Sequence, residues 1–334
     1  MRPKALVLCK ALIVILLAAL TTSAQFQIRT RVDLVVVPVT VKNSGGELTA
    51  GLTKADFRVY ENGREQTITN FTADPVPLSV IVLVDSGLSP TTFKKIQNTL
   101  PALTEAFSAF DEVAVYRFDT HLAKLSEFSN NKDAVETALA RLKDIEPVKT
   151  TDSMGGAPFS TPGPLINGMP ADPSLRLPNG PAPKLDKILH DAMFAAADEL
   201  RKRAPERRRV MVVVSDGRAG RNEHNYDQVL HRLLENNIEV YSIGMDQAYL
   251  SRKFSVLDKY SKATGGDAFF LNATDSLEHS YSRAAEEARN QYVLGYLSNN
   301  EAPAAEPIYR QIDVRLARAG LKVLHRSGYY QVPR

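Results

Sequence analysis

The chain has 334 residues, of which 44% are hydrophobic and 24% are charged, and its formal net charge is +3. This length suits one large domain with a smaller one. The composition excludes a disordered chain, a coiled coil and a fibrous repeat.

The first 24 residues predict a secretory signal peptide. Basic residues precede a short apolar run at 11–20, and a small-x-small cleavage pattern ends at Ala24. The alternative is a retained N-terminal anchor helix, but the run is short for a membrane span of roughly 20 residues. No later stretch is apolar enough to cross a bilayer. We therefore expect a periplasmic or secreted protein with no stable membrane span after cleavage.

Cleavage would change two bulk properties of the chain. The only cysteine, Cys9, would be lost, which excludes disulfides and thiolate metal sites from the mature protein. Three of the 41 basic residues and none of the 38 acidic ones lie in the signal, so the mature formal charge is 38 − 38, or zero. A neutral exported protein is a poor candidate for binding nucleic acid.

The two ends of the mature chain both predict β structure. Residues 26–75 are rich in β-branched side chains, and alternating runs flank Asn62-Gly63, a dipeptide that accepts the positive φ of a hairpin turn. The segment 292–334 also predicts strands. Because these strands have no place in a completed α/β sheet, we expect them to pair with the N-terminal segment. Together they would form a small β module that is split in sequence around the central domain.

The central residues, 76–291, predict an α/β domain. Apolar strands alternate with helical segments, and the strands at 78–84 and 209–215 are almost entirely apolar, as expected when helices cover both sheet faces. The alternation predicts a doubly wound, mainly parallel sheet. A loop insertion at 147–183, with nine Pro and five Gly, interrupts it.

Two of these apolar strands end in an acidic residue followed by a glycine-containing turn. Ligands of doubly wound sheets bind at the carboxyl ends of the strands, so Asp85 and Asp216 would meet at one rim if their strands are neighbours. Ser89, with Ser86 or Ser215, would add hydroxyl groups. This set suits a hard cation such as Mg²⁺ or Mn²⁺. The alternative is that both Asp residues only cap helices and fix turns.

Several motifs carry a family resemblance. They are Asp85 and Ser89, Asp216-Gly217, Tyr241-Ser242-Ile243-Gly244, Thr264-Gly265-Gly266 and the segment 290–296 (NQYVLGY). On these motifs the central domain resembles a von Willebrand factor A (vWA) domain, whose metal-ion-dependent adhesion site begins Asp-x-Ser-x-Ser. The flanking segments 52–57 (LTKADF), 60–63 (YENG) and 328–330 (GYY) are similar to a vWA-related group described from Acidobacteria.

The resemblance implies a metal site at Asp85, Ser89 and Asp216, but two positions depart from the family motif. Gly87 replaces the middle Ser, and Lys187 stands where the family has a metal-binding Thr. A Lys ammonium only donates hydrogen bonds and cannot ligate a cation.

Three interpretations of this position remain open. Lys187 is a built-in counter-ion between the two carboxylates, or it is a solvated side chain on a helix face, or Thr150 or Thr151 supplies the missing hydroxyl. Depending on which interpretation holds, the site binds Mg²⁺ or Mn²⁺ or is metal-free.

The resemblance also implies a protein partner, because in vWA domains a partner's carboxylate completes the cation's coordination. We therefore predict an exported, non-enzymatic binding protein with a degenerate adhesion site. One alternative is a structural subunit that docks through its split β module. Another is a hydrolase that uses Asp85, Ser89 and Asp216, although no His is placed as a base. The basic run 201–209 predicts a solvated helix end rather than an anion-binding patch.

Overall fold

The computed structural model describes residues 34–146, 165–166, 169–170, 186–246, 248, 255–271, 276–301, 303 and 305–333. The predicted signal peptide lies outside these residues, as does most of the predicted loop at 147–183. Within that loop the described residues are two short antiparallel strands, β8 (Leu165–Ile166) and β9 (Met169–Pro170).

A six-stranded sheet forms the middle of the α/β domain. Its order is β12-β11-β10-β5-β6-β7, and every neighbouring pair is parallel except β6 with β7. All eight residues of β5 and seven of the eight in β10 are buried, which confirms that both faces are covered. The strands are β5 (Leu78–Asp85), β6 (Glu112–Phe118), β7 (Leu122–Lys124), β10 (Arg208–Ser215), β11 (Ile238–Gly244) and β12 (Ala268–Phe270).

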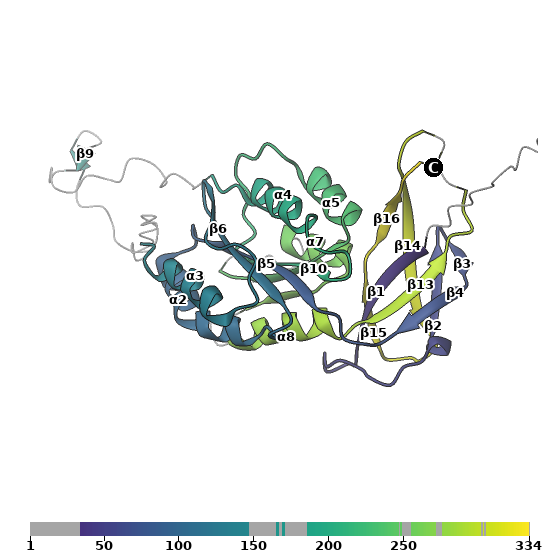
Figure 1. Cartoon of the computed structure of the whole chain (residues 1–334). Helices are drawn as coiled ribbons and strands as arrows, with labels where there is room; N and C mark the ends of the chain where they lie inside the picture. Colours follow the sequence, from purple (N-terminus) through teal and green to yellow (C-terminus); the bar gives the residue numbers. More distant parts are fainter. Residues whose placement is uncertain are drawn as a thin grey trace, which may run out of the picture. The chain divides into compact units, whose positions relative to one another are not determined.

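Helices cover the sheet on both faces, as Figure 1 shows. The helices α2, α3 and α8 pack on one face, and α4, α5 and α7 pack on the other, with a separate apolar core on each side. Their bounds are α2 (Pro90–Glu105), α3 (Lys132–Lys143), α4 (Leu189–Leu200), α5 (Tyr226–Glu235), α7 (Val256–Thr264) and α8 (Leu277–Arg289). Across the described residues, no helix combines the length and the apolar character that a membrane span requires. The predicted doubly wound α/β fold is confirmed.

The strands from the two ends of the chain form the predicted β module (Figure 1). One sheet has the order β15-β1-β13-β4, in which C-terminal and N-terminal strands alternate, and the other has the order β16-β14-β2-β3, in which the two ends meet where β14 pairs with β2. Val37, Phe57 and Tyr292 are among the residues that fill the core between them. The strands are β1 (Leu34–Lys42), β2 (Phe57–Glu61), β3 (Arg64–Gln66), β4 (Ile68–Thr72), β13 (Tyr292–Leu297), β14 (Ile308–Leu316), β15 (Lys322–His325) and β16 (Gly328–Gln331).

The predicted hairpin at Asn62-Gly63 is also confirmed. Antiparallel β2 and β3 are joined there, and both turn residues have positive φ, 49° and 79°. This is the geometry that a two-residue hairpin requires of its central positions, which explains why an Asn-Gly pair stands there.

Glu61, just before this turn, is a fully buried carboxylate at the centre of the β module. Its oxygens accept hydrogen bonds from the hydroxyls of Tyr296 (2.7 Å), Ser298 (2.7 Å) and Tyr329 (3.2 Å), and from the amide of Asn300. The YENG motif and the GYY motif therefore meet at one buried carboxylate. Their role here is to hold the two ends of the chain together.

The basic run 201–209 is the predicted solvated helix end only in part: Arg201 and Lys202 are exposed at the end of α4, but the later arginines make internal contacts. Arg203 forms two hydrogen bonds to Glu112, and Arg207 donates to the carbonyls of Leu78 and Phe110. The side chain of Arg208 is only 7% exposed and donates to the carbonyl of Ala288. Arg207 and Arg208 thus bind main-chain carbonyls and Arg203 binds a carboxylate, uses that a count of charges in the sequence does not reveal.

His325 gives the β module a dependence on pH. The backbone N–H of Val314 donates to its Nε2 at 3.2 Å, and its Nδ1 lies 2.8 Å from the carbonyl of Arg326, so the ring is neutral with its proton on Nδ1. Burial lowers the pKa of His325 below its ordinary value. The unfolded chain therefore binds more protons as pH falls through about 6.5, and stability falls with it.

We expect His325→Leu to lower the free energy of unfolding at pH 7 by about 1–3 kcal/mol, because the Val314 N–H loses its acceptor. Urea unfolding followed by circular dichroism at several pH values between 7.5 and 5 measures this. The variant should also lose less stability than the parent as the pH falls. An equal loss in both proteins would contradict the role of His325.

Candidate functional site

Two neighbouring strands bring the predicted acidic residues together at the carboxyl end of the sheet. β5 and β10 are parallel, with Val84 opposite Val214, so Asp85 lies beside Ser215 and Asp216 follows directly. The hydroxyl of Ser215 donates to Asp85 Oδ2 at 2.8 Å. The side chains of both Asp residues are 0% exposed. The rim that the sequence predicts therefore contains two buried carboxylates.

Lys187 lies between these two carboxylates. Its Nζ is 2.8 Å from Asp85 Oδ2 and 3.0 Å from Asp216 Oδ2, and its side chain is 1% exposed. This is the counter-ion arrangement, one of the three interpretations that the sequence leaves open. The solvated side chain on a helix face is excluded, because α4 begins only at Leu189 and Lys187 precedes it.

The main chain at Lys187 is held by hydrogen bonds to the peptide group that joins this residue to Ile188. Its carbonyl accepts from the N–H of Gly220 at 2.7 Å and from the Asn222 amide at 3.2 Å, and the next residue, Ile188, donates to the carbonyl of Asp119 at 3.0 Å. A Cβ at Gly220 would come within 2.5 Å of the Asp186 Cα. The chain on either side of Lys187 is thus held close against the neighbouring rim loop, which directs the ammonium inward.

The other carboxylate oxygens also have donors from the protein. Asp85 Oδ1 accepts from the N–H of Gly87 at 2.9 Å, and Asp216 Oδ1 accepts from the N–H of Arg218 at 3.0 Å. The Arg218 Nε donates to Asp216 Oδ2 at 2.7 Å. Burial raises the pKa of Asp85, while the ammonium of Lys187 opposes this rise. Each Asp side chain therefore accepts a main-chain N–H from the turn that follows it, in addition to binding the ammonium of Lys187.

The hydroxyls of Ser86 and Ser89, unlike that of Ser215, do not contact the carboxylates of Asp85 and Asp216. Ser89 is the N-cap of α2: its hydroxyl accepts from the N–H of Thr92 at 3.3 Å and donates to the Thr92 hydroxyl at 2.9 Å. The Ser86 hydroxyl donates to Asp119 Oδ2 at 3.0 Å and to the Phe118 carbonyl at 3.1 Å. The structure thus places Ser89 near the start of α2 in a capping role.

The residues at this rim do not fit a divalent cation of the kind vWA metal sites hold. The ammonium of Lys187 lies within hydrogen-bond distance of both carboxylates, where a bridging cation would bind, and a lysine cannot ligate it. Gly87 offers no hydroxyl. In the described ranges, moreover, no three His, Cys, Asp or Glu side chains are grouped so as to hold a metal. The third interpretation, with Thr150 or Thr151, lies outside the described residues.

Sequence reasoning missed three rim residues: Arg218, Asp119 and Asn222. Arg218 follows Asp216 by two residues, a spacing with no family signal. Asp119 directly follows β6, so the strand-end rule that found Asp85 could have found it too. Its pKa lies below the ordinary value: burial alone would raise it, but hydrogen bonds from His121 and Ser86 and the charge of Arg117 outweigh this.

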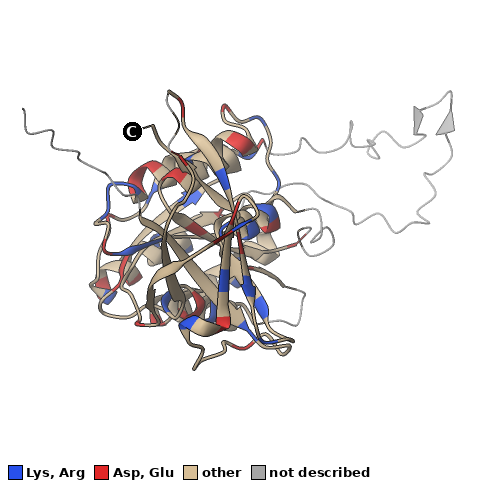
Figure 2. Ribbon diagram, turned by 90° about the vertical axis from the view of Figure 1, so that its right-hand side faces the viewer, with Lys and Arg blue, Asp and Glu red and all other residues tan. Residues whose placement is uncertain are grey.

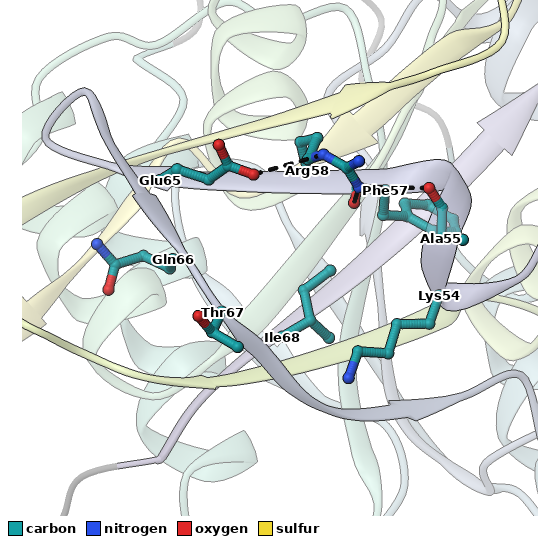
Figure 3. A pocket seen from close by; sticks show the side chains of 8 residues that line it. All are labelled: Lys54, Ala55, Phe57, Arg58, Glu65, Gln66, Thr67 and Ile68. Carbon is teal, nitrogen blue, oxygen red and sulfur yellow. Dashed lines mark hydrogen bonds and ion pairs between the residues drawn. The ribbon is translucent and has the colours of Figure 1, made fainter.

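A second, more open site lies in the β module (Figure 3). It is a hollow of about 630 Å³ beside the short helix η1 (Lys54–Asp56) and the edge strand β3. Arg58 and Glu65 form an ion pair of 3.4 Å there, and both side chains are more than half exposed. The lining residues are Lys54, Ala55, Phe57, Arg58, Glu65, Gln66, Thr67 and Ile68.

Part of the α/β domain matches the von Willebrand factor A family by sequence. Residues 184–283 match the profile of the von Willebrand factor type A domain. This range contains Lys187 and Asp216, but Asp85 and Ser89 precede it. Among curated proteins, none matches the chain.

Solved structures of similar fold include a protein of the mussel byssus, proximal thread matrix protein 1. The two are 12% identical with a TM-score of 0.43, and the match covers 64% of this chain and 49% of the mussel protein. This chain thus spans about half the length of that protein. One of its structures is described as having a zinc-occupied MIDAS motif.

Two bacterial structures are also similar. An aerotolerance-related membrane protein from Bacteroides fragilis is 14% identical with a TM-score of 0.42, and the match covers 63% of this chain and 99% of that one. The protein BatB from Bacteroides thetaiotaomicron is 14% identical with a TM-score of 0.40, with coverage of 63% and 98%. At these TM-scores the likeness says nothing about function.

Proposed function

We propose that this chain is an exported, non-enzymatic binding protein that captures a protein partner at the rim of its vWA-like sheet. The observation that carries the proposal is the convergence of Asp85, Asp216 and Lys187 at the carboxyl ends of adjacent strands. This is where sheets of this class bind ligands. Three buried charged groups there are costly to desolvate, and such a cost is more readily explained by a functional rim than by stability alone.

The export part of the proposal rests on the sequence of residues 1–24. The choice of a protein partner is supported by the distribution of charge. Lys and Arg residues are interspersed with Asp and Glu along the described ribbon (Figure 2). The basic run at 201–209 is largely engaged in internal contacts. Binding of nucleic acid relies on a basic surface. Neither the mixed distribution of charge nor the basic run indicates such a surface.

The rim hydroxyls also favour binding over hydrolysis. A serine nucleophile needs a base within hydrogen-bond reach. The hydroxyl of Ser89, the serine of that alternative, instead donates to the hydroxyl of Thr92, which is not a base. A hydrolase that uses Asp85, Ser89 and Asp216 is therefore the weaker alternative.

A second candidate function is docking through the β module, which the open hollow beside β3 supports. In this alternative the protein is a structural subunit, and the rim does not contact the partner. The hollow has charged side chains at its edge and an apolar floor that includes Phe57 and Ile68. The two candidates therefore predict different binding surfaces on one molecule.

Two double variants that add negative charge separate these surfaces. His121→Glu with Arg221→Glu alters exposed residues of the rim loops, and Lys54→Glu with Arg58→Glu alters the hollow. Each variant is first shown to have the melting temperature of the parent. It is then used to capture partners from the native envelope fraction. We expect the rim variant to lose at least about tenfold in capture, because like-charge contacts cost several kcal/mol. The hollow variant should bind as the parent does. The reverse result would favour docking through the β module, and no loss in either would contradict both.

A further inference from the structure

The rim supplies from its own side chains the charge that a divalent cation would bring. The carboxylates of Asp85 and Asp216 carry two negative charges, and Lys187 and Arg218 carry two positive ones. Both cationic groups contact Asp216 Oδ2, at 3.0 Å and 2.7 Å, and Lys187 also reaches Asp85 Oδ2 at 2.8 Å. The site is therefore neutral with no ion bound. A buried pair of carboxylates needs such compensation, because an unpaired buried charge is strongly destabilising.

The protein also prevents Lys187 from giving way to an incoming ion. Its carbonyl is bound by Gly220 and Asn222, and the adjacent N–H of Ile188 is bound to Asp119. Since these hydrogen bonds hold the peptide group between Lys187 and Ile188, the side chain is the part that could move most readily. Moving it would leave the ammonium buried without its acceptors, since the side chain is 1% exposed. A cation must therefore compete with a group that is already in place.

We propose that Lys187 and Arg218 replace the divalent cation of a vWA rim, so that the rim is complete without metal and a cation site is latent beneath the Lys187 side chain. The consequence for binding, that partner capture needs no metal, rests on the proposed function. The latent cation site does not, because it concerns only the two carboxylates and the lysine between them.

The first test measures the parent protein with MnCl₂ alone. We expect no saturable heat of binding by calorimetry. We also expect a melting temperature that changes by less than about 1 °C between excess EDTA and roughly 10 mM MnCl₂, because an ion that does not bind the native state cannot stabilise it. Saturable binding of Mn²⁺ at micromolar concentration would overturn the proposal.

The second test removes the lysine side chain. Lys187→Ala should be less stable than the parent in EDTA and should gain roughly 2–5 °C in melting temperature with Mn²⁺, as expected for an ion that binds only the folded state. Adding Asp216→Asn removes one ligand and should abolish this gain. Lys42→Ala is the matched control, because Lys42 is a second buried lysine between two carboxylates, 2.6 Å from Asp267 and 2.5 Å from Glu287. An equal gain there would show a general property of paired carboxylates and overturn a latent rim site.

A second variant covers the case in which Lys187→Ala does not fold. Lys187→Thr with Gly87→Ser adds two hydroxyl ligands, and it is prepared in Mn²⁺. If neither variant folds in Mn²⁺ or responds to it, the latent site is wrong. Partner capture with and without EDTA is a separate measurement: loss in EDTA would overturn metal independence. If the rim variants do not affect capture at all, the proposed function fails while the metal results stand.

Discussion

Replacing Lys187 with Met is expected to lower the free energy of unfolding by about 3–5 kcal/mol at pH 7, because it leaves two buried carboxylates without their shared cation. Met is close to Lys in shape, so the change removes the charge and its hydrogen bonds with little loss of volume. The chain has no Trp, and urea unfolding followed by far-ultraviolet circular dichroism measures the effect.

Two controls separate this effect from a general cost of losing a lysine. Lys262→Met removes an exposed pair with Asp258 at 2.6 Å and should cost less than about 0.5 kcal/mol. Lys187→Met with Asp85→Asn removes one charge of each sign and should recover more than half of the loss. If Lys187→Met costs no more than Lys262→Met, the buried ion pair is not what stabilises the rim.

The second large effect is expected in the β module. Glu61→Ala should lower the free energy of unfolding by about 3 kcal/mol or more, because four donors lose a buried charged acceptor and hydrogen bonds to charged groups are the strong ones. The same urea unfolding measures it. The β module should lose stability while the rim keeps its contacts.

Glu65→Ala is the matched control for this variant. Glu65 lies on the next strand, and its side chain is 56% exposed in an ion pair with Arg58. Its loss should cost less than about 0.5 kcal/mol. Comparable costs for Glu61→Ala and Glu65→Ala would mean that the buried carboxylate does not join the two ends of the chain.

The fold follows closely from patterns in the sequence. The apolar strands at 78–84 and 209–215 predict a sheet covered on both faces, and the Asn62-Gly63 dipeptide predicts a hairpin whose turn has positive φ; both are observed. The split β module also follows from the sequence, since strands at the two ends had no place in the central sheet. These features depend on the local spacing of apolar residues and on the backbone conformations that individual turn residues allow. Both can be recognised in the sequence itself.

The site follows from the sequence only in part. Asp85 and Asp216 are found by the strand-end rule, because parallel neighbours bring their carboxyl ends together. The burial of Lys187 is not predictable from its own neighbours, since it depends on Gly220 and Asn222 holding its carbonyl from another loop. Arg218 is missed for a different reason, because its contact with Asp216 is local but that spacing carries no family signal. The contacts that bury Lys187 are of another kind. Such contacts join loops that are distant in sequence, and no pattern of hydrophobicity encodes them.

The split β module also constrains the order in which the chain can fold. Tyr296 and Glu61, which are hydrogen-bonded, stand 235 residues apart. A chain made from its N-terminus exposes β1 and β2 long before their partners β13 and β14 exist, whereas β5 to β12 can assemble from contiguous sequence. We therefore expect the central domain to form first. β1 and β2 should keep unpaired edges until β13 and β14 have been synthesised. A protein cut short before residue 292 would keep those edges open and be prone to aggregation.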